Sequence, residues 1–426
     1  VYYVQEKGHN VQEGRPRDEK YKEMRLITLE NPGNSAEVEH VRSLRYASEA
    51  TLRFPFQVGE YPAFVMQSTE LAALISSIYR KNRELERLCT EVPKGAVEQF
   101  NQSTMVEEIQ QTNEVENVHS TRREIRDAVA RVEQGQTGAR FDGMVRKYNM
   151  LLAHKPIPLE VSADVRRLYN EFILDEVVRE NPKNAPDGVV FRKDPTSVYS
   201  EHDQKLHEGL YPESKIMEAM EQSLAMLNNE EIDPLIRAAA FHYMFAYIHP
   251  FYDGNGRMTR FISSYVLSRS FCEAACLRIA YVIKDHRKAY YRLFKEANDK
   301  RSRGDLTRFV TEFLRFFEQA LDEATASLAE KNERYRRYYT LLTSALAAMP
   351  KVDRWYRVML QIMLQEELFG HPRFDMQRLA RLADHNERTV RSKLEKSGGL
   401  VRHEIDGKKY WWRINLEALG NGAENE

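Results

Sequence analysis

A glycine-rich loop at residues 249–260, set between two apolar stretches, constrains the fold of this chain more than any other feature. Residues 238–248 and 261–267 are apolar at helical spacing, so we predict two buried helices joined by the loop. The loop ends at the N-terminus of the second helix, where unpaired backbone N–H groups carry partial positive charge. Gly254 and Gly256 allow a positive φ and a close approach to a ligand. The loop is therefore predicted to cradle an anion such as phosphate.

The side chains of this loop suggest how a nucleotide would be handled. Asp253 supplies a hard carboxylate oxygen, and Mg²⁺ commonly takes one or two carboxylates together with substrate phosphates. Arg257 and Arg260 lie three positions apart on one helical face and can fork onto phosphate oxygens. His249 is the group with an ordinary pKa near neutrality, so it is the candidate general base. Together these residues suit attack by a hydroxyl on a metal-bound nucleoside triphosphate.

Length and composition exclude several other classes. A chain of 426 residues, 42% hydrophobic and 30% charged, is expected to be a soluble protein of two or three domains. It has no apolar run near the ~18–20 residues that span a bilayer, so no membrane partner is expected. Its thin cysteine usage (Cys89, Cys272 and Cys276) does not form a disulfide framework, and buried thiols in a reducing, cytoplasmic protein are expected. The first residues lack a secretory signal pattern, which agrees with that expectation.

Turn residues and periodicity divide the chain into four predicted segments. We expect an irregular N-terminal segment at 1–50 and a helical region at 51–135, which includes a polar helix at about 105–131. A helical domain is predicted at 136–337 and a separate C-terminal domain at 351–418, with the linker near Met349. Two β-favouring runs at 189–192 and 196–199 predict a short hairpin within the helical domain.

The loop sequence resembles the signature of a known family. His-Pro-Phe-x-Asp-Gly-Asn-Gly-Arg, followed by x-x-Arg, is typical of the Fic family, and every fixed position is filled from His249 to Arg260. A chance match to these positions has a probability on the order of 10⁻⁸ from average residue usage. The resemblance implies a mainly α fold: a Fic helical bundle with a short β-hairpin flap. It also implies a nucleotidyltransferase that moves AMP from ATP onto a Tyr, Thr or Ser hydroxyl of a protein.

The resemblance assigns roles to the residues of the loop. It implies His249 as the base and Asp253 as the Mg²⁺ ligand. It also implies that Asn255 and its flanking glycines, Gly254 and Gly256, hold the α- and β-phosphates. Arg257 is implied to bind the phosphates, and Arg260 the γ-phosphate. Phe251 is implied to be a core anchor, which its apolar side chain also suggests.

Further nucleotide contacts are implied outside the loop. In the family a β-hairpin flap precedes the motif and aligns the target by strand addition. The run at 189–199 matches this flap in position, with Val198 and Tyr199 as nucleotide-side residues. Tyr290, Tyr291 and Asn298 lie where the family has residues that contact base and ribose. Aromatic packing between helices is the alternative interpretation of these three positions.

A second motif predicts self-inhibition. Fic proteins that regulate themselves carry Ser/Thr-x-x-x-Glu-Gly/Asn on an inhibitory helix, and Thr112 to Asn117 fits this pattern. Glu116 is predicted to form a bidentate ion pair with Arg260 and so to keep that arginine from the γ-phosphate. In some relatives the same glutamate positions water to remove AMP. The alternative is a solvated acidic helix face, because several other glutamates lie nearby.

The C-terminal segment resembles a winged helix-turn-helix domain. Three helical stretches are followed by two β-favouring runs that flank a turn at 406–407. Residues 378–413 hold ten Lys or Arg against five acids, a net charge of +5 in a chain of net −1. We predict Arg388, Arg391 and Lys408 as DNA contacts, since local basicity favours phosphate. Such domains also dock proteins or dimerise, so a homodimer stays open.

Two functions from different classes follow. The first is a protein adenylyltransferase that acts on a target protein or on itself with ATP and Mg²⁺. The second is a DNA-binding transcriptional regulator whose Fic domain senses nucleotide with little catalysis. The intact His249 favours the first, and the basic C-terminal segment supports the second.

Overall fold

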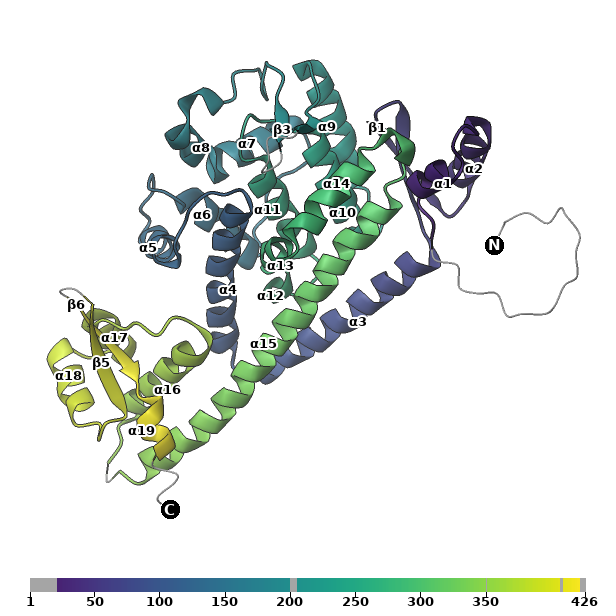
Figure 1. Cartoon of the computed structure of the whole chain (residues 1–426). Coiled ribbons are helices and arrows are strands. Elements are labelled where there is room, and N and C mark those ends of the chain that lie inside the picture. The colour runs from purple at the N-terminus through teal and green to yellow at the C-terminus, as the bar shows by residue number, and fades with distance from the viewer. Residues whose placement is uncertain (1–20, 200–204, 350, 407–408, 422–426) are drawn as a thin grey trace, which may run out of the picture.

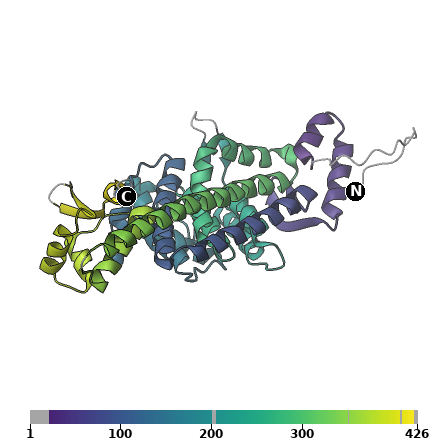
Figure 2. The ribbon, with the colours of Figure 1, turned by 90° about the horizontal axis from the view of Figure 1, so that it is seen from below.

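The structure is a computed structural model and describes residues 21–199, 205–349, 351–406 and 409–421. It is mainly helical, as predicted, with three separate two-stranded antiparallel sheets among the described residues. No helix in these ranges is long and apolar enough to cross a membrane. The molecule is elongated, with the first helices at one end and the C-terminal module at the other (Figures 1 and 2).

Two long helices run side by side in the same direction along this axis, since Ser77 pairs with Glu318 near the start of both and Glu91 with Arg336 further along. α15 (Thr307–Ala347) has 41 residues, which makes it about 60 Å long, and a stripe of apolar side chains along it is buried. It runs beside α3 (Thr69–Glu91), as Figure 2 shows. α3 begins where the Ser68 hydroxyl accepts a hydrogen bond from the Leu71 N–H, an N-cap of the usual kind. Pro93 then separates α3 from α4 (Lys94–Val115).

The central helical bundle is built around α10 (Pro234–Ile248), most of whose residues are buried. Pro234 at its first position and the Asp233 carboxylate, which accepts from the Leu235 N–H at 2.8 Å, fix where it begins. α10 packs against α9 (Glu213–Leu227), α11 (Asn255–Leu267) and α15. The remaining helices of this part are α5 (Arg122–Glu133), α6 (Asp142–Leu152), α7 (Ser162–Phe172), α8 (Leu174–Glu180), η1 (Pro182–Asn184), α12 (Glu273–Cys276), α13 (Ile279–Asp285), α14 (Arg287–Ala297) and η2 (Lys300–Ser302).

The prediction of an irregular segment at 1–50 was wrong for its described part. Residues 24–47 form α1 (Met24–Glu30) and α2 (Ser35–Ala47). The prediction of a helix from the start of the next region also failed, because β1 (Thr51–Val58) and β2 (Tyr61–Met66) form a hairpin there. The polar helix expected at about 105–131 is divided in two, since α4 ends at Val115 and α5 begins at Arg122.

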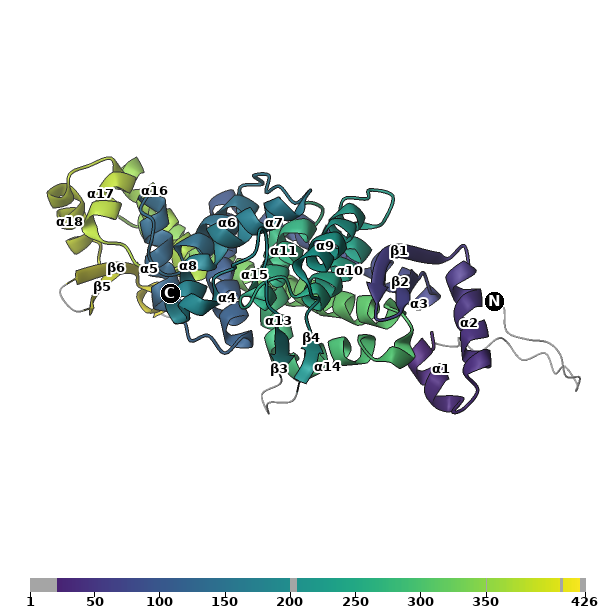
Figure 3. The same cartoon turned by 90° about the horizontal axis from the view of Figure 1, so that it is seen from above.

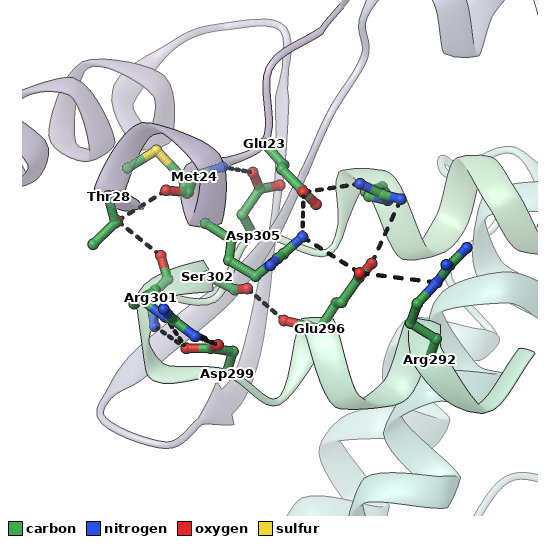
Figure 4. A network of polar contacts seen from close by, with 11 residues as sticks. Glu23, Met24, Thr28, Arg292, Glu296, Asp299, Arg301, Ser302 and Asp305 are labelled. Atoms are coloured by element: carbon green, nitrogen blue, oxygen red, sulfur yellow. Dashed lines mark hydrogen bonds and ion pairs between the residues drawn. The ribbon is translucent and has the colours of Figure 1, made fainter. Parts of the chain in front are cut away.

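A network of charged side chains holds α1 and the residues before it against α14 and α15 (Figure 4). The Glu23 carboxylate contacts Arg25 at 3.1 Å and Arg308 at 2.9 Å, and Glu296 contacts the same two arginines at 3.3 and 3.5 Å. The first backbone N–H of α1 donates to the Asp305 carboxylate at 3.1 Å. These contacts fix the N-terminal helices on the corner formed by α14, η2 and α15.

The C-terminal module has the predicted order of three helices and a hairpin. It consists of α16 (Arg354–Phe369), α17 (Met376–Ala383), α18 (Glu387–Glu395), β5 (Val401–Asp406), β6 (Lys409–Ile414) and α19 (Leu416–Asn421). α16 packs against both α15 and α4. The approach to α4 is close, because a Cβ on Gly370 would lie 2.9 Å from the Gln99 side chain. The module therefore rests directly on α4.

Candidate active site

The loop between α10 and α11 has the two left-handed residues that a tight return of the chain requires. His249 ends α10 with φ of 51°, and Gly254 precedes α11 with φ of 81°. Inside the loop, the Asn255 side chain accepts from the Phe251 N–H at 3.0 Å and donates to the Phe251 carbonyl at 2.8 Å. This amide therefore fixes the loop, and the phosphate contact predicted for Asn255 would have to come from its backbone N–H.

Phe251 is the core anchor of the loop, as predicted. Its ring is fully buried and stacks on Tyr169, with the ring centres 3.7 Å apart and the planes 13° from parallel. Phe191 packs against it edge-on with the ring centres 5.5 Å apart. Burial of three aromatic rings ties the loop to α7 and to the segment before the flap.

Arg257, in the first turn of α11, is a buried cation with few partners. Its side chain is fully buried, and none of its three guanidinium nitrogens makes a hydrogen bond to a described residue. The nearest carboxylate is Asp253, whose Oδ1 lies 3.5 Å from Arg257 Nη2. The first N–H groups of α11 also have no carbonyl partner within the helix. A buried charge without hydrogen-bond acceptors is costly, so this position favours an anion.

Glu176 on α8 is a site residue that the sequence did not identify. Burial raises its pKa to about 7, against the opposing attraction of Arg257. Its Oε1 accepts from the Phe141 N–H at 3.0 Å. No motif covers this position, and only the folded chain brings the carboxyl near enough to Arg257 for their charges to interact.

Arg260, one turn further along α11, contacts the end of α4 through all three of its guanidinium nitrogens. Its Nη1 lies 2.7 Å from Glu116 Oε1, which is the predicted ion pair. The bidentate geometry predicted for that pair is not formed, because the other nitrogens bind Thr112. Nε donates to Thr112 Oγ1 at 2.8 Å, and Nη2 donates to the Thr112 carbonyl at 2.9 Å. Burial alone would raise the pKa of Glu116, but the charge of Arg260 outweighs it and holds that pKa below its ordinary value.

The fit between α4 and α11 depends on a glycine. A Cβ on Gly256 would lie 2.0 Å from Glu116 Oε1, so any side chain there would displace the carboxylate. Asn117, directly after Glu116, has φ of 58°. A left-handed residue after a helix end is usually Gly or Asn, which accounts for the last position of the predicted inhibitory motif.

One face of α4 carries three of the contacts around Arg260. Glu108, Thr112 and Glu116 are spaced four apart and so lie on one side of the helix. Glu108 is fully buried and accepts from the Ala280 N–H at 2.9 and 3.1 Å, at the first turn of α13. Burial raises its pKa to about 7, against the attraction of the Ala280 N–H and Arg260. The sequence analysis missed Glu108, although its spacing from Thr112 was a usable signal.

The residues expected to contact base and ribose lie on or after α14. The Tyr290 hydroxyl is 2.7 Å from a ring nitrogen of His242, and Asn298 accepts from the Tyr243 hydroxyl at 2.7 Å. The Tyr291 hydroxyl donates to the Val115 carbonyl at 3.4 Å, beside the end of α4. Two of the three predicted side chains therefore contact α10, and one contacts α4.

The predicted flap is present but begins later in the sequence than expected. β3 (Ser197–Tyr199) pairs with β4 (Lys205–Glu208), at one edge of the body in Figure 3. Residues 189–192 do not form a strand, because the backbone N–H groups of 189, 190 and 191 donate to the Glu213 carboxylate. The backbones of Val198 and Tyr199 lie in β3, while their side chains fall outside the described residues.

Arg192 is a second positioning residue that sequence reasoning missed. It is fully buried, and its Nε donates to the His249 carbonyl at 2.9 Å. Its other nitrogens donate to the carbonyls of Asp194 at 2.6 Å and Leu210 at 2.8 Å. One side chain thus joins both ends of the flap to the residue at the end of α10.

The residues predicted to contact DNA lie far from this site. Arg388 and Arg391 are exposed on α18, whose inner side is formed by Val390 and Leu394. Lys408 lies outside the described residues.

Part of this chain is similar to known proteins. Residues 162–267 match the Fic/DOC family, a span that runs from α7 to the end of α11. "Protein adenylyltransferase Fic" of Nematostella vectensis is 33% identical over 113 residues, 26% of this chain and 24% of the relative. "Protein adenylyltransferase fic-1" of Caenorhabditis elegans is 36% identical over 98 residues, 22% of this chain and 18% of the relative. The chain thus spans about a quarter or less of the length of these relatives.

Solved structures of Fic proteins are also similar to this one. A Fic family protein from Desulfovibrio desulfuricans has 18% identity and a TM-score of 0.49, over 82% of this chain and 96% of that one. The Fic-1 fragment from C. elegans has 19% identity and a TM-score of 0.43, over 72% and 82%. The structure is mainly helical, and the loop at 249–260 joins α10 to the N-terminus of α11. Residues 162–267 therefore form a domain of the Fic/DOC family.

Proposed function

We propose that this protein transfers AMP from ATP onto a protein hydroxyl, and that Glu116 restrains the transfer. The observation that carries the proposal is Arg257, a fully buried guanidinium without hydrogen-bond acceptors at the N-terminus of α11. Phosphate oxygens would supply those acceptors, and the helix terminus would add to their attraction. The name adenylyltransferase, given to the relatives matched over the Fic domain, supports ATP as the donor.

In this mechanism His249 acts as the general base. It lies half-buried at the end of α10, and the hydrogen bond from Arg192 to its carbonyl holds its backbone in place. The imidazole takes the proton of the target hydroxyl as the hydroxyl oxygen attacks the α-phosphorus of ATP. The bond to the β-phosphate breaks and pyrophosphate leaves, so that AMP remains on the protein. Arg257 would bind phosphate oxygens during this step.

Asp253 is the residue that would hold Mg²⁺. The described residues contain no group of three or more His, Cys, Asp or Glu side chains suited to a metal. A single carboxylate still fits Mg²⁺, because this ion is usually bound by one or two carboxylates together with substrate phosphates. The Asp253 side chain is 36% exposed and lies beside Arg257, where phosphate is expected. When bound, the ion would neutralise phosphate charge and support departure of pyrophosphate.

Inhibition follows from the contacts of Arg260 in this mechanism. All three of its nitrogens face Glu116 or Thr112, so the guanidinium is engaged by α4. A γ-phosphate that needs Arg260 must displace the Glu116 carboxylate. ATP bound without that contact would not align its α-phosphate with the target hydroxyl. Movement of the end of α4 would release the arginine.

Incubation with radiolabelled ATP, Mg²⁺ and cell lysate tests this proposal. The Glu116→Gly variant should label itself or lysate proteins much faster than the parent. Glu114→Gly is the matched control, because Glu114 is an exposed acid on the same helix that pairs with Lys284 instead. A Glu116→Gly variant that labels nothing would contradict the proposal. Incubation of a pre-modified target then shows whether Glu116 also supports removal of AMP, which the same substitution would abolish.

The C-terminal module supports a second candidate function, DNA binding through a winged-helix domain. The observation that favours it is α18, which presents Arg388 and Arg391 to solvent within a segment of local net positive charge. A helix that follows a short turn and carries exposed arginines is the usual reader of the major groove. α16 of the same module packs on α4. DNA bound to α18 would therefore contact a module that rests on the helix preceding Glu116.

A further inference from the structure

Two cysteines that are far apart in the sequence lie side by side where the end of α3 meets the start of α12. Cys89 is in the last turn of α3, and Cys272 is the residue directly before α12. Their Sγ atoms are 3.8 Å apart, across a sequence separation of 183 residues. Both are free thiols in this structure. The distance is too long for a covalent bond and short enough for a thiol–thiol hydrogen bond.

Other contacts fix the register of the two segments. The Cys272 N–H donates to Asn82 Oδ1 at 2.9 Å, and Asn82 lies two turns before Cys89 on the same face of α3. One turn earlier, Tyr79 packs against Phe271 with ring centres 5.1 Å apart. The two thiols therefore face each other because Tyr79, Asn82 and Cys89 of α3 all contact the chain around Cys272.

The two thiols differ in accessibility. Cys89 is half-buried, while Cys272 is 8% exposed. The hydrogen bond from Cys272 lowers the pKa of Cys89, although burial and the nearby acids Glu273 and Glu86 oppose the shift. The pKa of Cys272 is raised by the same pairing and by its burial. The more exposed thiol with a lowered pKa, next to a shielded partner, is the arrangement of an attacking and a resolving cysteine.

We propose that Cys89 and Cys272 form a redox-reversible modification site, at which a hydroperoxide converts the two thiols into an intramolecular disulfide. The Cys89 thiolate attacks the peroxide oxygen, which gives the Cys89 sulfenic acid and releases water or an alcohol. Cys272 Sγ then attacks the sulfenic sulfur, the S–O bond breaks, and the oxygen leaves as water with the proton of Cys272. The two thiols lose two electrons and two protons in total, and the peroxide accepts them. A dithiol such as dithiothreitol reverses the change.

The geometry permits this bond at small cost in structure. The Sγ atoms must approach from 3.8 Å to about 2.05 Å. Cys89 is three residues from the first residue beyond α3, where the last helical carbonyls lack intrahelical partners and the backbone can adjust. The bond would close a very long loop and so restrict the unfolded chain strongly. The oxidised protein should therefore unfold at a temperature several degrees higher than the reduced protein.

Thiol counting on the full-length protein tests the proposal. The reduced protein is treated with hydrogen peroxide, freed of excess oxidant, denatured and alkylated with N-ethylmaleimide before intact-mass measurement. The expected product has lost two hydrogen atoms and carries one alkyl group, on Cys276. The same product carries three alkyl groups when dithiothreitol reduces it before alkylation. Peptide mapping should join Cys89 to Cys272 in a monomer. An oxidised protein that keeps all three alkylation sites, or links them between molecules, would overturn the proposal.

Single substitutions separate the two steps. Cys272→Ser should stop the reaction at the Cys89 sulfenic acid, which dimedone then traps. Cys276→Ser is the matched control, since Cys276 is fully buried and outside the pair, and its disulfide should form as in the parent. If Cys89→Ser loses its free thiols to peroxide as the parent does, Cys89 is not the attacking residue and the proposal fails. Circular dichroism of each reduced variant verifies that it is folded.

Discussion

Glu116 at the end of α4 and Arg260 in α11 form a 2.7 Å ion pair that joins the two motifs of this sequence. Arg260 is fully buried, while the Glu116 side chain is 29% exposed, so the carboxylate is the partner that can leave. Gly256 provides the space that the carboxylate occupies. Movement at one helix end is therefore enough to change the partner of a buried arginine.

The first prediction concerns the coupling of this pair. Glu116→Gly should raise AMP transfer, because Arg260 becomes available to the γ-phosphate. Arg260→Ala should lower transfer, and the double variant should be no faster than Arg260→Ala alone. This non-additivity is expected when two side chains act on one site. Initial rates of labelling for the four proteins measure it, and additive effects would mean that Glu116 acts elsewhere.

A second prediction concerns Thr112, which holds Arg260 through Oγ1 and through its carbonyl. Thr112→Val keeps the shape and removes the hydroxyl, so it should weaken the hold of α4 and raise transfer by about tenfold, the effect of one hydrogen bond to a charged group. Thr112→Ser should restore the parental rate. Equal rates for the Val and Ser variants would show that the backbone carbonyl alone supplies the contact.

The third prediction tests the base. In the Glu116→Gly background, His249→Ala should slow AMP transfer by about 10²–10⁴-fold, the usual contribution of a positioned acid or base. ATP affinity, measured by calorimetry, should change little, because the imidazole is assigned to the hydroxyl proton. His40→Ala, an exposed histidine on α2, is the control. A His249→Ala variant with parental activity would remove His249 from the mechanism.

Residue type and local spacing predicted the loop and its two helices, and the resemblance to Fic proteins predicted the Glu116–Arg260 pair. Each of these features lies in a short sequence motif, at 249–260 or at 112–117. The contacts that position the site were not predictable in this way. Arg192 and Glu176 act through segments that meet only in the folded chain, and Glu213 binds the backbone that was expected to form a strand.

The hairpin of β1 and β2 was missed for a different reason. Phe54, Phe56 and Val58 are buried at alternate positions, which is the period of a strand. Pro55 lies within that run, and proline disfavours a strand because it cannot donate a hydrogen bond. A two-stranded sheet tolerates it, since each strand has an unpaired edge. The helices at 24–47 gain their stability from contacts with α14 and α15, which local sequence does not reveal.

Glu108 leads to a prediction about pH. Burial raises its pKa from 4.5 to about 7. Between these values the folded protein holds a proton that the unfolded chain has released, so the free energy of unfolding falls as pH rises and levels off above about 7. The loss attributable to Glu108 is about 3 kcal/mol. The Tm of Glu108→Gln should therefore fall less than that of the parent between about pH 5 and pH 8, while Glu114→Gln should behave as the parent. Parallel curves for Glu108→Gln and the parent would contradict this assignment.

The last prediction concerns the C-terminal module. If α18 binds DNA, affinity should fall steeply with salt, because each phosphate that a cation neutralises releases counterions. Arg388→Ala and Arg391→Ala should each weaken binding and reduce the salt slope by about one, and Lys408→Ala should act similarly at the hairpin. Lys94→Ala is the control, since Lys94 is an exposed cation on α4, outside this module. Fluorescence anisotropy with a random-sequence duplex at several salt concentrations measures these slopes. Absence of binding at low salt, together with a dimer in sedimentation that Arg388→Ala disrupts, would assign α18 to protein docking instead.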